Sequence, residues 1–350
     1  MTDRKPVRLG LAGAGLVGKR HAQIILDHPE VMLAGIADPS SEAATFAGSI
    51  GVTCHDDLAG MMDAERPDGV IVATPNQLHV EHGLACVAAG IPMLIEKPIA
   101  SNAGEAARLV DAAEAAGILI LVGHHRRHNP IIAWAKARID GGALGRIVAV
   151  HGVCWLYKPD GYFDVPWRSQ PGAGPVFINL IHDMDLLRHL CGEVARVQAI
   201  ASSGVRGLPV EDTAAVVLEF ANGALGTVTV SDNIVGPHSW ELTAAENPAY
   251  PVTDASCYTI GGSHGTLELP ACRIWHNPGE RGWWEPIEAA AEAPPSQDPL
   301  VEQIGHFSRV IRGHEAPLVS GREGLRTLEL IEAIKIAAET GAPVDLGEPV

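Results

Sequence analysis

The sequence predicts an α/β protein, in which a doubly wound parallel sheet precedes an α+β domain with an open, mostly antiparallel sheet. Up to residue 122, short apolar runs alternate with alanine-rich helical segments, which is typical of parallel strands joined by crossover helices. After residue 124, strand-like runs follow one another directly. We therefore expect two domains, over residues 1–123 and 124–350.

The first half contains apolar runs with the length of buried strands, at 7–12, 31–37, 69–73, 91–95 and 118–122. Segments with helical periodicity lie between them, at 17–27, 41–50, 77–89 and 103–116. Gly90 and Gly117 directly follow two of these segments. We expect both glycines to end their helices, because glycine readily adopts the left-handed conformation.

The second half contains strand-like runs at 147–155, 194–202, 214–220, 225–230, 240–244, 258–260 and 266–269. Asn222-Gly223, between two of them, indicates a tight hairpin turn. Helical segments are expected at 131–139, 181–190, 300–312 and 321–338. Residues 289–299, rich in Ala, Glu and Pro, are expected to form a surface loop.

Charge and cysteine content restrict the class of protein. The 350 residues carry a formal net charge of -17, which disfavours nucleic acid and anionic membranes as partners. No apolar run is long enough to span a bilayer, and no signal-like segment opens the chain. The six cysteines show no paired spacing. We expect a cytoplasmic protein with reduced thiols.

A glycine fingerprint, Gly13-Ala14-Gly15-Leu16-Val17-Gly18, follows the first expected strand and opens the first helix. In a dinucleotide-binding turn, Gly13 would permit the tight turn, Gly15 the approach of a pyrophosphate, and Gly18 close helix–strand packing. Leu16 and Val17 would begin the helix whose free N–H groups bind that pyrophosphate. The alternative is a glycine-rich turn without a ligand.

Asp38 ends the second expected strand, twenty residues after Gly18. This is the spacing of the acidic residue that binds the ribose hydroxyls in a Rossmann domain. A carboxylate there would repel a 2′-phosphate, and no arginine follows in 39–42. The sequence therefore predicts NAD(H) as the cofactor. The alternative is that Asp38 caps a helix.

Glu96-Lys97-Pro98 follows the expected strand at 91–95. A lysine at the carboxyl end of a parallel strand can reach a ligand crevice and transfer a proton there. Lys97 is therefore a candidate acid/base. Alternatively, it is a solvated lysine before a turn proline.

The fingerprint, the Ala73-Thr74-Pro75-Asn76-Gln77-Leu78-His79 segment and Glu96-Lys97-Pro98, in this order and spacing, resemble the Gfo/Idh/MocA oxidoreductase family. The resemblance implies a Rossmann domain with an open-sheet second domain. It also implies NAD(P)-dependent oxidation or reduction of sugars and cyclitols. Homodimers or homotetramers through the second domain's sheet are common in the family.

By this resemblance, Thr74, Asn76, His79 and Glu96 would contact the cofactor, and Lys97 would lie nearest the reacting carbon. His182, followed three residues later by Asp185, matches the second-domain motif and is the second catalytic candidate. Polyol dehydrogenases of the family usually carry an aspartate four residues before that histidine. This chain has Ile178 there and Asn179 next to it, and Asn179 is expected to bind a substrate hydroxyl.

The resemblance also places Arg127 near cofactor or substrate, Arg168 near the cofactor, and Trp167 against a sugar ring. Arg127 belongs to a histidine-rich segment at 124–130 that lacks the acidic or cysteine ligands of a metal site, so we expect no metal.

We therefore expect an NAD-dependent dehydrogenase or reductase that acts on a CH–OH group of a sugar, cyclitol or related polyol. Two alternatives remain open. One is a glycoside hydrolase that retains NAD and oxidises its substrate transiently. The other is a non-catalytic NAD-binding regulator.

Overall fold

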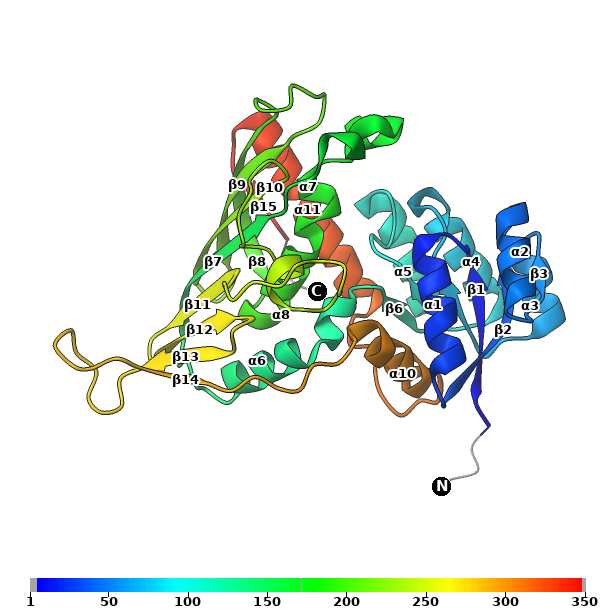
Figure 1. Ribbon diagram of the computed structural model, residues 1–350, viewed down its shortest axis with the longest axis horizontal. Coiled ribbons are helices and arrows are strands. Elements are labelled where there is room, and N and C mark those ends of the chain that lie inside the picture. Colours follow the sequence, from blue (N-terminus) through cyan, green and yellow to red (C-terminus); the bar gives the residue numbers. More distant parts are fainter. Residues whose placement is uncertain (1–4, 171, 348–350) are drawn as a thin grey trace. The chain divides into compact units, whose positions relative to one another are not determined.

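The computed structural model describes residues 5–170 and 172–347, and the chain divides into two compact units. Unit 1 comprises Met1–His128 and Asp298–Leu328, and unit 2 comprises Asn129–Gln297 and Glu329–Val350. Figure 1 follows the chain through both. The boundary thus lies at 128/129, close to the expected 123/124, but the sequence did not indicate that residues 298–328 return to unit 1.

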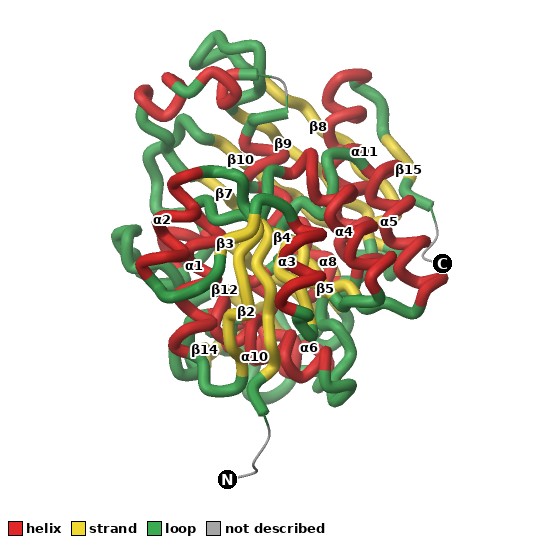
Figure 2. Tube along the Cα trace, turned by 90° about the vertical axis from the view of Figure 1, so that its right-hand side faces the viewer, coloured by secondary structure: helices red, strands yellow, loops and turns green. Residues whose placement is uncertain are grey.

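A six-stranded sheet forms the centre of unit 1, and all its neighbouring strands run parallel. Its strands in spatial order are β3 (Cys54–His55), β2 (Val31–Ala37), β1 (Val7–Ala12), β4 (Gly69–Val72), β5 (Met93–Ile95) and β6 (Ile120–Val122), and most can be followed in Figure 2. The order reverses between β1 and β4. In doubly wound sheets, ligands bind beside the carboxyl ends of the strands at this point.

The helices and short 3₁₀ turns of unit 1 include α1 (Leu16–Asp27), α2 (Ser41–Ser49), α3 (Leu58–Glu65), η1 (Asn76–Leu78), α4 (His79–Ala89), α5 (Ala103–Ala116), η2 (His125–His128) and α10 (Pro299–Ile311). The first six connect the strands, whereas η2 and α10 follow β6. α4 ends at Gly90 and α5 at Gly117, with φ values of 71° and 67°, which confirms both expected helix ends. α5 begins where the Asn102 side chain accepts a hydrogen bond from the Glu105 N–H.

The late helix α10 packs against the beginning of β4. A Cβ on Gly69 would lie 2.5 Å from Cδ1 of Ile311 and 3.1 Å from Cζ of Phe307. The glycine therefore leaves the space that these two side chains fill. Together with the packing of α10 against α1 and η2, this contact keeps residues near 300 in unit 1.

Unit 2 contains a nine-stranded sheet, in which β7 and β10 are parallel neighbours and the other neighbouring pairs are antiparallel. The strands in spatial order are β14 (Glu288–Ala291), β13 (Arg273–His276), β12 (Gly265–Leu269), β11 (Tyr258–Gly262), β7 (Ile147–Trp155), β10 (Leu225–Ser231), β9 (Thr213–Phe220), β8 (Val194–Ser202) and β15 (Val344–Asp345). β9 and β10 pair around Asn222-Gly223, as expected.

One face of this sheet is buried beneath helices and the other is exposed. The helical elements of unit 2 are α6 (Pro130–Asp140), η3 (Asp160–Asp164), η4 (Pro166–Ser169), α7 (Pro175–Ile178), α8 (Leu180–Cys191), α9 (Trp240–Thr243) and the later part of α11 (Gly321–Thr340). Val216, Leu218 and Phe220 of β9 point into the core, whereas Val217 between them is 49% exposed. α8 lies on the buried face (Figure 1).

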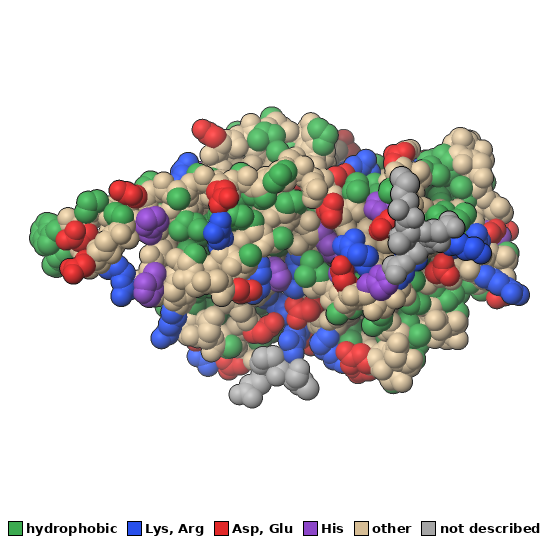
Figure 3. All heavy atoms as spheres, turned by 90° about the horizontal axis from the view of Figure 1, so that it is seen from below, with side chains coloured by type: hydrophobic (Ala, Val, Ile, Leu, Met, Phe, Trp, Pro, Cys, Tyr) green, Lys and Arg blue, Asp and Glu red, His purple; other side chains and the backbone are tan. Residues whose placement is uncertain are grey.

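Two expectations for unit 2 are wrong. Residues 240–244, expected as a strand, contain helix α9, which begins where Ser239 accepts a hydrogen bond from the Leu242 N–H. Residues 288–291, which overlap the start of the loop expected at 289–299, form strand β14. The tip of the β13–β14 hairpin carries Trp283 and Trp284, which are 90% and 86% exposed, and apolar side chains gather at the left edge of Figure 3.

Across the described part of the chain, every helix is too short or too polar to serve as a membrane span.

Candidate active site

The glycine turn joins β1 to α1. Gly13 has a φ of +89°, and a Cβ there would lie 2.6 Å from the carbonyl oxygen of Ala73. A Cβ on Gly18 would lie 2.0 Å from the Gly13 oxygen, so packing requires glycine at both positions. A Cβ on Gly15 would meet no atom within 4 Å. This open space, at the uncapped N-terminus of α1, fits a dinucleotide pyrophosphate.

The carboxylate of Asp38 turns back toward the glycine turn. Its Oδ2 accepts a hydrogen bond from the Ala14 N–H at 2.8 Å, and its Oδ1 accepts one from the Ser40 N–H at 2.9 Å. Burial raises the pKa of this carboxyl, but these donors and the charge of Lys19 outweigh burial and hold the pKa below its usual value. An ionised carboxylate here can accept ribose hydroxyls and repels a 2′-phosphate.

The first two residues of α1 are exposed, Leu16 at 90% and Val17 at 44%. Both are apolar side chains exposed to solvent at the N-terminus of α1, so they are available to cover a ligand bound there. Their contact with the cofactor stays a prediction.

The turn after β4 is tied to the turn after β5 by His79. This ring is buried, with Nδ1 2.8 Å from the Pro98 carbonyl oxygen and Nε2 2.8 Å from the Thr74 carbonyl oxygen. Asn76 lies half-buried in η1, between these contacts in sequence. The structure thus gives His79 a part in holding two turns together, which the resemblance did not indicate.

Glu96 and Lys97 begin the turn after β5. The Glu96 side chain is largely buried, and its Oε1 lies 2.7 Å from Nε2 of His21 on α1. Its Oε2 accepts a hydrogen bond from the Lys97 N–H at 3.3 Å. The sequence reasoning missed His21, whose only signal was a histidine on the buried face of α1, three residues after Gly18.

The strand order brings the carboxyl ends of β1, β4 and β5 side by side. The glycine turn, Thr74 and Lys97 follow these three ends directly. Unit 1 therefore gathers a dinucleotide-binding turn and a lysine at one edge of its sheet.

In unit 2, Ile178, Asn179 and His182 lie where α7 meets α8. Asn179 ends α7 and precedes α8, and its carbonyl oxygen accepts a hydrogen bond from the His182 N–H at 3.1 Å. The Asn179 side-chain Oδ1 is buried without a hydrogen-bond partner among the described residues. A buried acceptor of this kind is normally satisfied by protein, water or ligand.

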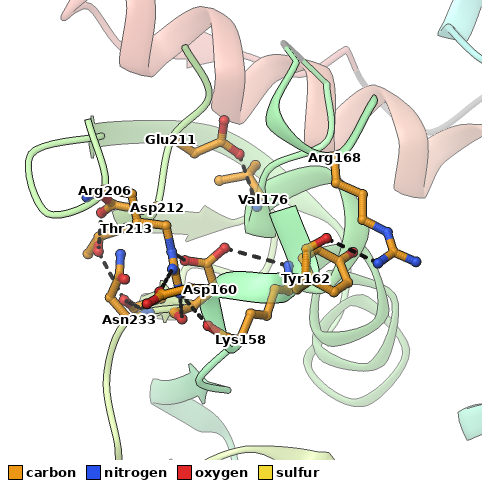
Figure 4. A network of polar contacts seen from close by, with 12 residues as sticks. Lys158, Asp160, Tyr162, Arg168, Val176, Arg206, Glu211, Asp212, Thr213 and Asn233 are labelled. Atoms are coloured by element: carbon orange, nitrogen blue, oxygen red, sulfur yellow. Dashed lines mark hydrogen bonds and ion pairs between the residues drawn. The ribbon is translucent and has the colours of Figure 1, made fainter. Parts of the chain in front are cut away.

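Trp167 and Arg168 lie in η4, and Arg168 belongs to the polar network of Figure 4. The Arg168 Nη1 donates to the Tyr162 carbonyl oxygen at 3.1 Å, and its guanidinium lies 4.2 Å from the centre of the Tyr162 ring. Trp167 is 56% exposed, as a side chain available for a ligand would be. Lys158 lies nearby, with Nζ 3.6 Å from Oδ2 of Asp232.

Arg127 is buried in unit 1 and pairs with Glu323, from Nη2 to Oε2 at 3.0 Å. This ion pair occupies part of the guanidinium that we expected at the substrate. Residues 5–170 and 172–347 contain no group of three or more histidine, cysteine or acidic side chains arranged to hold a metal ion.

Comparisons with known proteins agree with this geometry. A family profile described as an oxidoreductase family with an NAD-binding Rossmann fold matches residues 7–124, and the C-terminal domain profile of the same family matches residues 132–268. Inositol 2-dehydrogenase 4 of Saccharopolyspora erythraea is 30% identical, over 99% of this chain and 98% of its own.

Solved structures give the same result. The WlbA dehydrogenase of Bordetella pertussis, in complex with NADH and UDP-GlcNAcA, is 28% identical and has a TM-score of 0.78, with 99% of this chain and 100% of that chain covered. An oxidoreductase of Agrobacterium radiobacter, in complex with NAD+, L-tartaric acid and magnesium, shares the fold, with a TM-score of 0.82 at 22% identity and coverage of 97% and 98%.

A glycine turn that fits a pyrophosphate, an anchored Asp38 and matches along both units have one common explanation. The chain is an NAD-binding oxidoreductase and belongs to the Gfo/Idh/MocA family.

Proposed function

We propose that this protein is an NAD-dependent dehydrogenase or reductase of a sugar, cyclitol or related polyol, with Lys97 as its acid/base. The position of Lys97 carries the proposal. It follows β5, one strand from β4 and two from β1, whose own turn fits the pyrophosphate. Relatives named inositol 2-dehydrogenase, levoglucosan dehydrogenase and D-apiose dehydrogenase support the substrate class.

The chemistry needs a base for a hydroxyl proton. NAD+, held by the glycine turn and Asp38, would supply the acceptor for the hydride that leaves the carbon of the hydroxyl group. The unprotonated Nζ of Lys97 takes the hydroxyl proton as the C=O bond forms, and in the reverse direction it returns that proton. The Asp38 carboxylate binds the ribose hydroxyls and disfavours NADP(H).

His182 and Asn179 would bind the substrate hydroxyl beside the reacting carbon. Two observations support this role for Asn179: its Oδ1 is buried without a protein partner among the described residues, and the neighbouring Ile178 cannot share a proton. Trp167 would pack against the apolar face of a sugar ring, and Arg168 would approach the cofactor. The amide of Asn179, one residue later in the chain, would thus act in place of the carboxylate that polyol dehydrogenases usually carry where this chain has Ile178.

A screen of sugars and inositols with NAD+, read as NADH formation, tests the activity. The Lys97→Ala variant should lose turnover, by about 100-fold or more, with NAD+ affinity kept within about threefold. Full activity in this variant would exclude Lys97 as acid/base. Release of a sugar from a glycoside without net NADH would instead identify the NAD-retaining hydrolase.

We also propose that the protein forms homodimers or homotetramers through the exposed face of the nine-stranded sheet. Apolar side chains on that sheet stay in water in the single chain, including Val148 at 54%, Ile200 at 74%, Val217 at 49% and Leu225 at 57% exposure. Light scattering of the wild type and of a Val217→Glu variant tests this. A monomeric wild type would refute it.

A further inference from the structure

A buried histidine and glutamate contact each other beside the backbone of Lys97. His21 is fully buried on α1, and its Nε2 lies 2.7 Å from Oε1 of Glu96. The other carboxylate oxygen, Oε2, accepts a hydrogen bond from the backbone N–H of Lys97 at 3.3 Å. Glu96 therefore bridges helix α1 and the backbone of the lysine turn.

The space around Glu96 leaves it little freedom. A Cβ on Gly123, which follows β6, would lie 2.8 Å from Oε2 of Glu96 and 3.0 Å from its carboxyl carbon. The Gly123 N–H also donates to the Ile95 carbonyl oxygen at 2.7 Å, which holds the two strand ends together. The carboxylate is therefore confined between α1, Lys97 and the end of β6.

Glu96 is ionised in these surroundings. Burial raises the pKa of its carboxyl, but the hydrogen bond and charge of His21, with the charges of His125 and Lys97, outweigh burial and hold the pKa below its usual value. The attraction between Glu96 and Lys97 is mutual, so the carboxylate also favours the protonated ammonium of the lysine.

We propose that His21 and Glu96 are positioning residues that hold Lys97 in place and link it to the helix that binds the cofactor. The inference rests on the proposed role of Lys97. α1 begins at the turn that fits the pyrophosphate, and one turn further along, His21 holds the residue before the lysine. Cofactor binding at one end of α1 and proton transfer at Lys97 are thereby joined through two side chains.

The alternative is that the pair serves the fold alone, in which case removing one partner would destabilise the protein by leaving the other buried and unpaired. A second histidine–glutamate pair in unit 1 provides a matched control. His55 and Glu65 contact each other from Nε2 to Oε1 at 3.2 Å. His55 lies in β3, at the edge of the sheet and four strands from β5, and Glu65 ends α3.

The variants Glu96→Gln, His21→Leu and His21→Gln test the proposal, with His55→Gln as the control. Glu96→Gln keeps a hydrogen-bonding group but removes the charge, so the acidic limb of the pH profile of kcat should move down by about one pH unit. His21→Leu should lower kcat by about 10- to 100-fold, because small displacements of a catalytic group have effects of this size. His21→Gln, which can still donate to Glu96, should restore part of the loss. The control should keep the wild-type kcat and pH profile.

A second readout needs no turnover. Acylation of Lys97 by acetic anhydride, followed across pH by peptide mass spectrometry, reports the protonation of its amine in the protein without substrate. Its midpoint should also fall by about one pH unit in Glu96→Gln. Unchanged midpoints and an unchanged kcat in Glu96→Gln and His21→Leu would overturn the proposal, even where the variants melt earlier. Full activity in Lys97→Ala would instead refute the role of the lysine, whatever the acylation shows.

Discussion

Nδ1 of His79 lies 2.8 Å from the carbonyl oxygen of Pro98, so a buried ring from α4 holds the residue after Lys97. Its Nε2 faces the Thr74 carbonyl oxygen at the same distance. Burial lowers the pKa of His79, although both carbonyl groups oppose this shift. The neutral ring has one N–H and donates to one carbonyl at a time.

Replacing His79 by Ala should destabilise unit 1 by about 1 to 3 kcal/mol, because the two carbonyl groups lose a buried partner. It should also lower kcat, since the lysine turn is released. Urea unfolding and steady-state kinetics measure both effects. His82→Ala, on the same helix, removes only a contact of 3.1 Å with the Thr74 hydroxyl, and its cost should be smaller.

Gly15→Ala separates ligand binding from folding. A methyl group there meets no atom within 4 Å, and the φ of Gly15 is -69°, so the free energy of unfolding should change by less than about 1 kcal/mol. The same methyl would meet a pyrophosphate, so NAD+ affinity should fall by tenfold or more, on the order of 1.4 kcal/mol. Calorimetric titration with NAD+ measures this. Unchanged affinity would show that the open space is not the pyrophosphate site.

Two substitutions of Asp38 separate the effect of its negative charge on cofactor preference from the effect of its hydrogen bond with the Ala14 N–H. Asp38→Asn keeps an oxygen for the Ala14 N–H but removes the negative charge, so the preference for NAD+ over NADP+ should narrow by about tenfold while NAD+ still binds. Asp38→Ala removes both and should weaken NAD+ as well. Titrations with the two cofactors compare the variants, and an unaltered preference in Asp38→Asn would contradict the electrostatic explanation.

Asn179→Ala should affect substrate binding more than stability. The Oδ1 atom is buried without a partner among the described residues, so its removal should leave the free energy of unfolding unchanged or raise it slightly. If Asn179 binds a substrate hydroxyl, KM should rise by about tenfold. A thermal melt measures the stability of the variant, and a steady-state kinetic assay measures its KM. Loss of stability with normal KM would mean that the amide serves the fold.

His128 should make the protein sensitive to acid. Burial, with the charges of His306, His125 and Arg127, lowers the pKa of His128 to about 3 from 6.5. At pH values between these two pKa values, the unfolded chain binds a proton at His128 that the native protein does not. The free energy of unfolding therefore falls as the pH falls. The loss should reach about 2 to 3 kcal/mol at pH 4.5. Urea unfolding of wild type and His128→Phe from pH 7 to about 4.5 measures this loss. The free energy of unfolding should fall more steeply with pH in the wild type, and equal slopes would refute the buried, neutral state of His128.

Local signals predicted much of the fold. Gly90 and Gly117 end their helices because a left-handed φ suits glycine, and Asn222-Gly223 forms the expected hairpin. The stretch at 240–244 misled, because its alternation of apolar and polar residues suits a strand as well as a short helix. There Trp240 is fully buried and stacks on Tyr258, with ring centres 5.8 Å apart, a tertiary contact that no local pattern reveals.

The places of Gly13, Asp38 and Lys97 at or after the ends of their strands were predictable, because each motif lies within one turn; their roles in binding and catalysis stay predictions. Contacts between distant segments were not predictable, because they depend on how strands are ordered in space. His21 and Glu96 are 75 residues apart, and Arg127 and Glu323 are 196 apart. A histidine within a helix or an arginine in a basic run carries no local mark of such a partner.

The packing of α10 on β4 also has a consequence for biosynthesis. A ribosome delivers this chain from its N-terminus, so Gly69 emerges long before Phe307 and Ile311 can cover it. The nascent nucleotide-binding unit therefore cannot complete its packing, and the apolar space beside Gly69 stays open to water, until the intervening residues have been translated. Unit 1, whose translation begins first, is thus among the last parts of the enzyme to complete its packing.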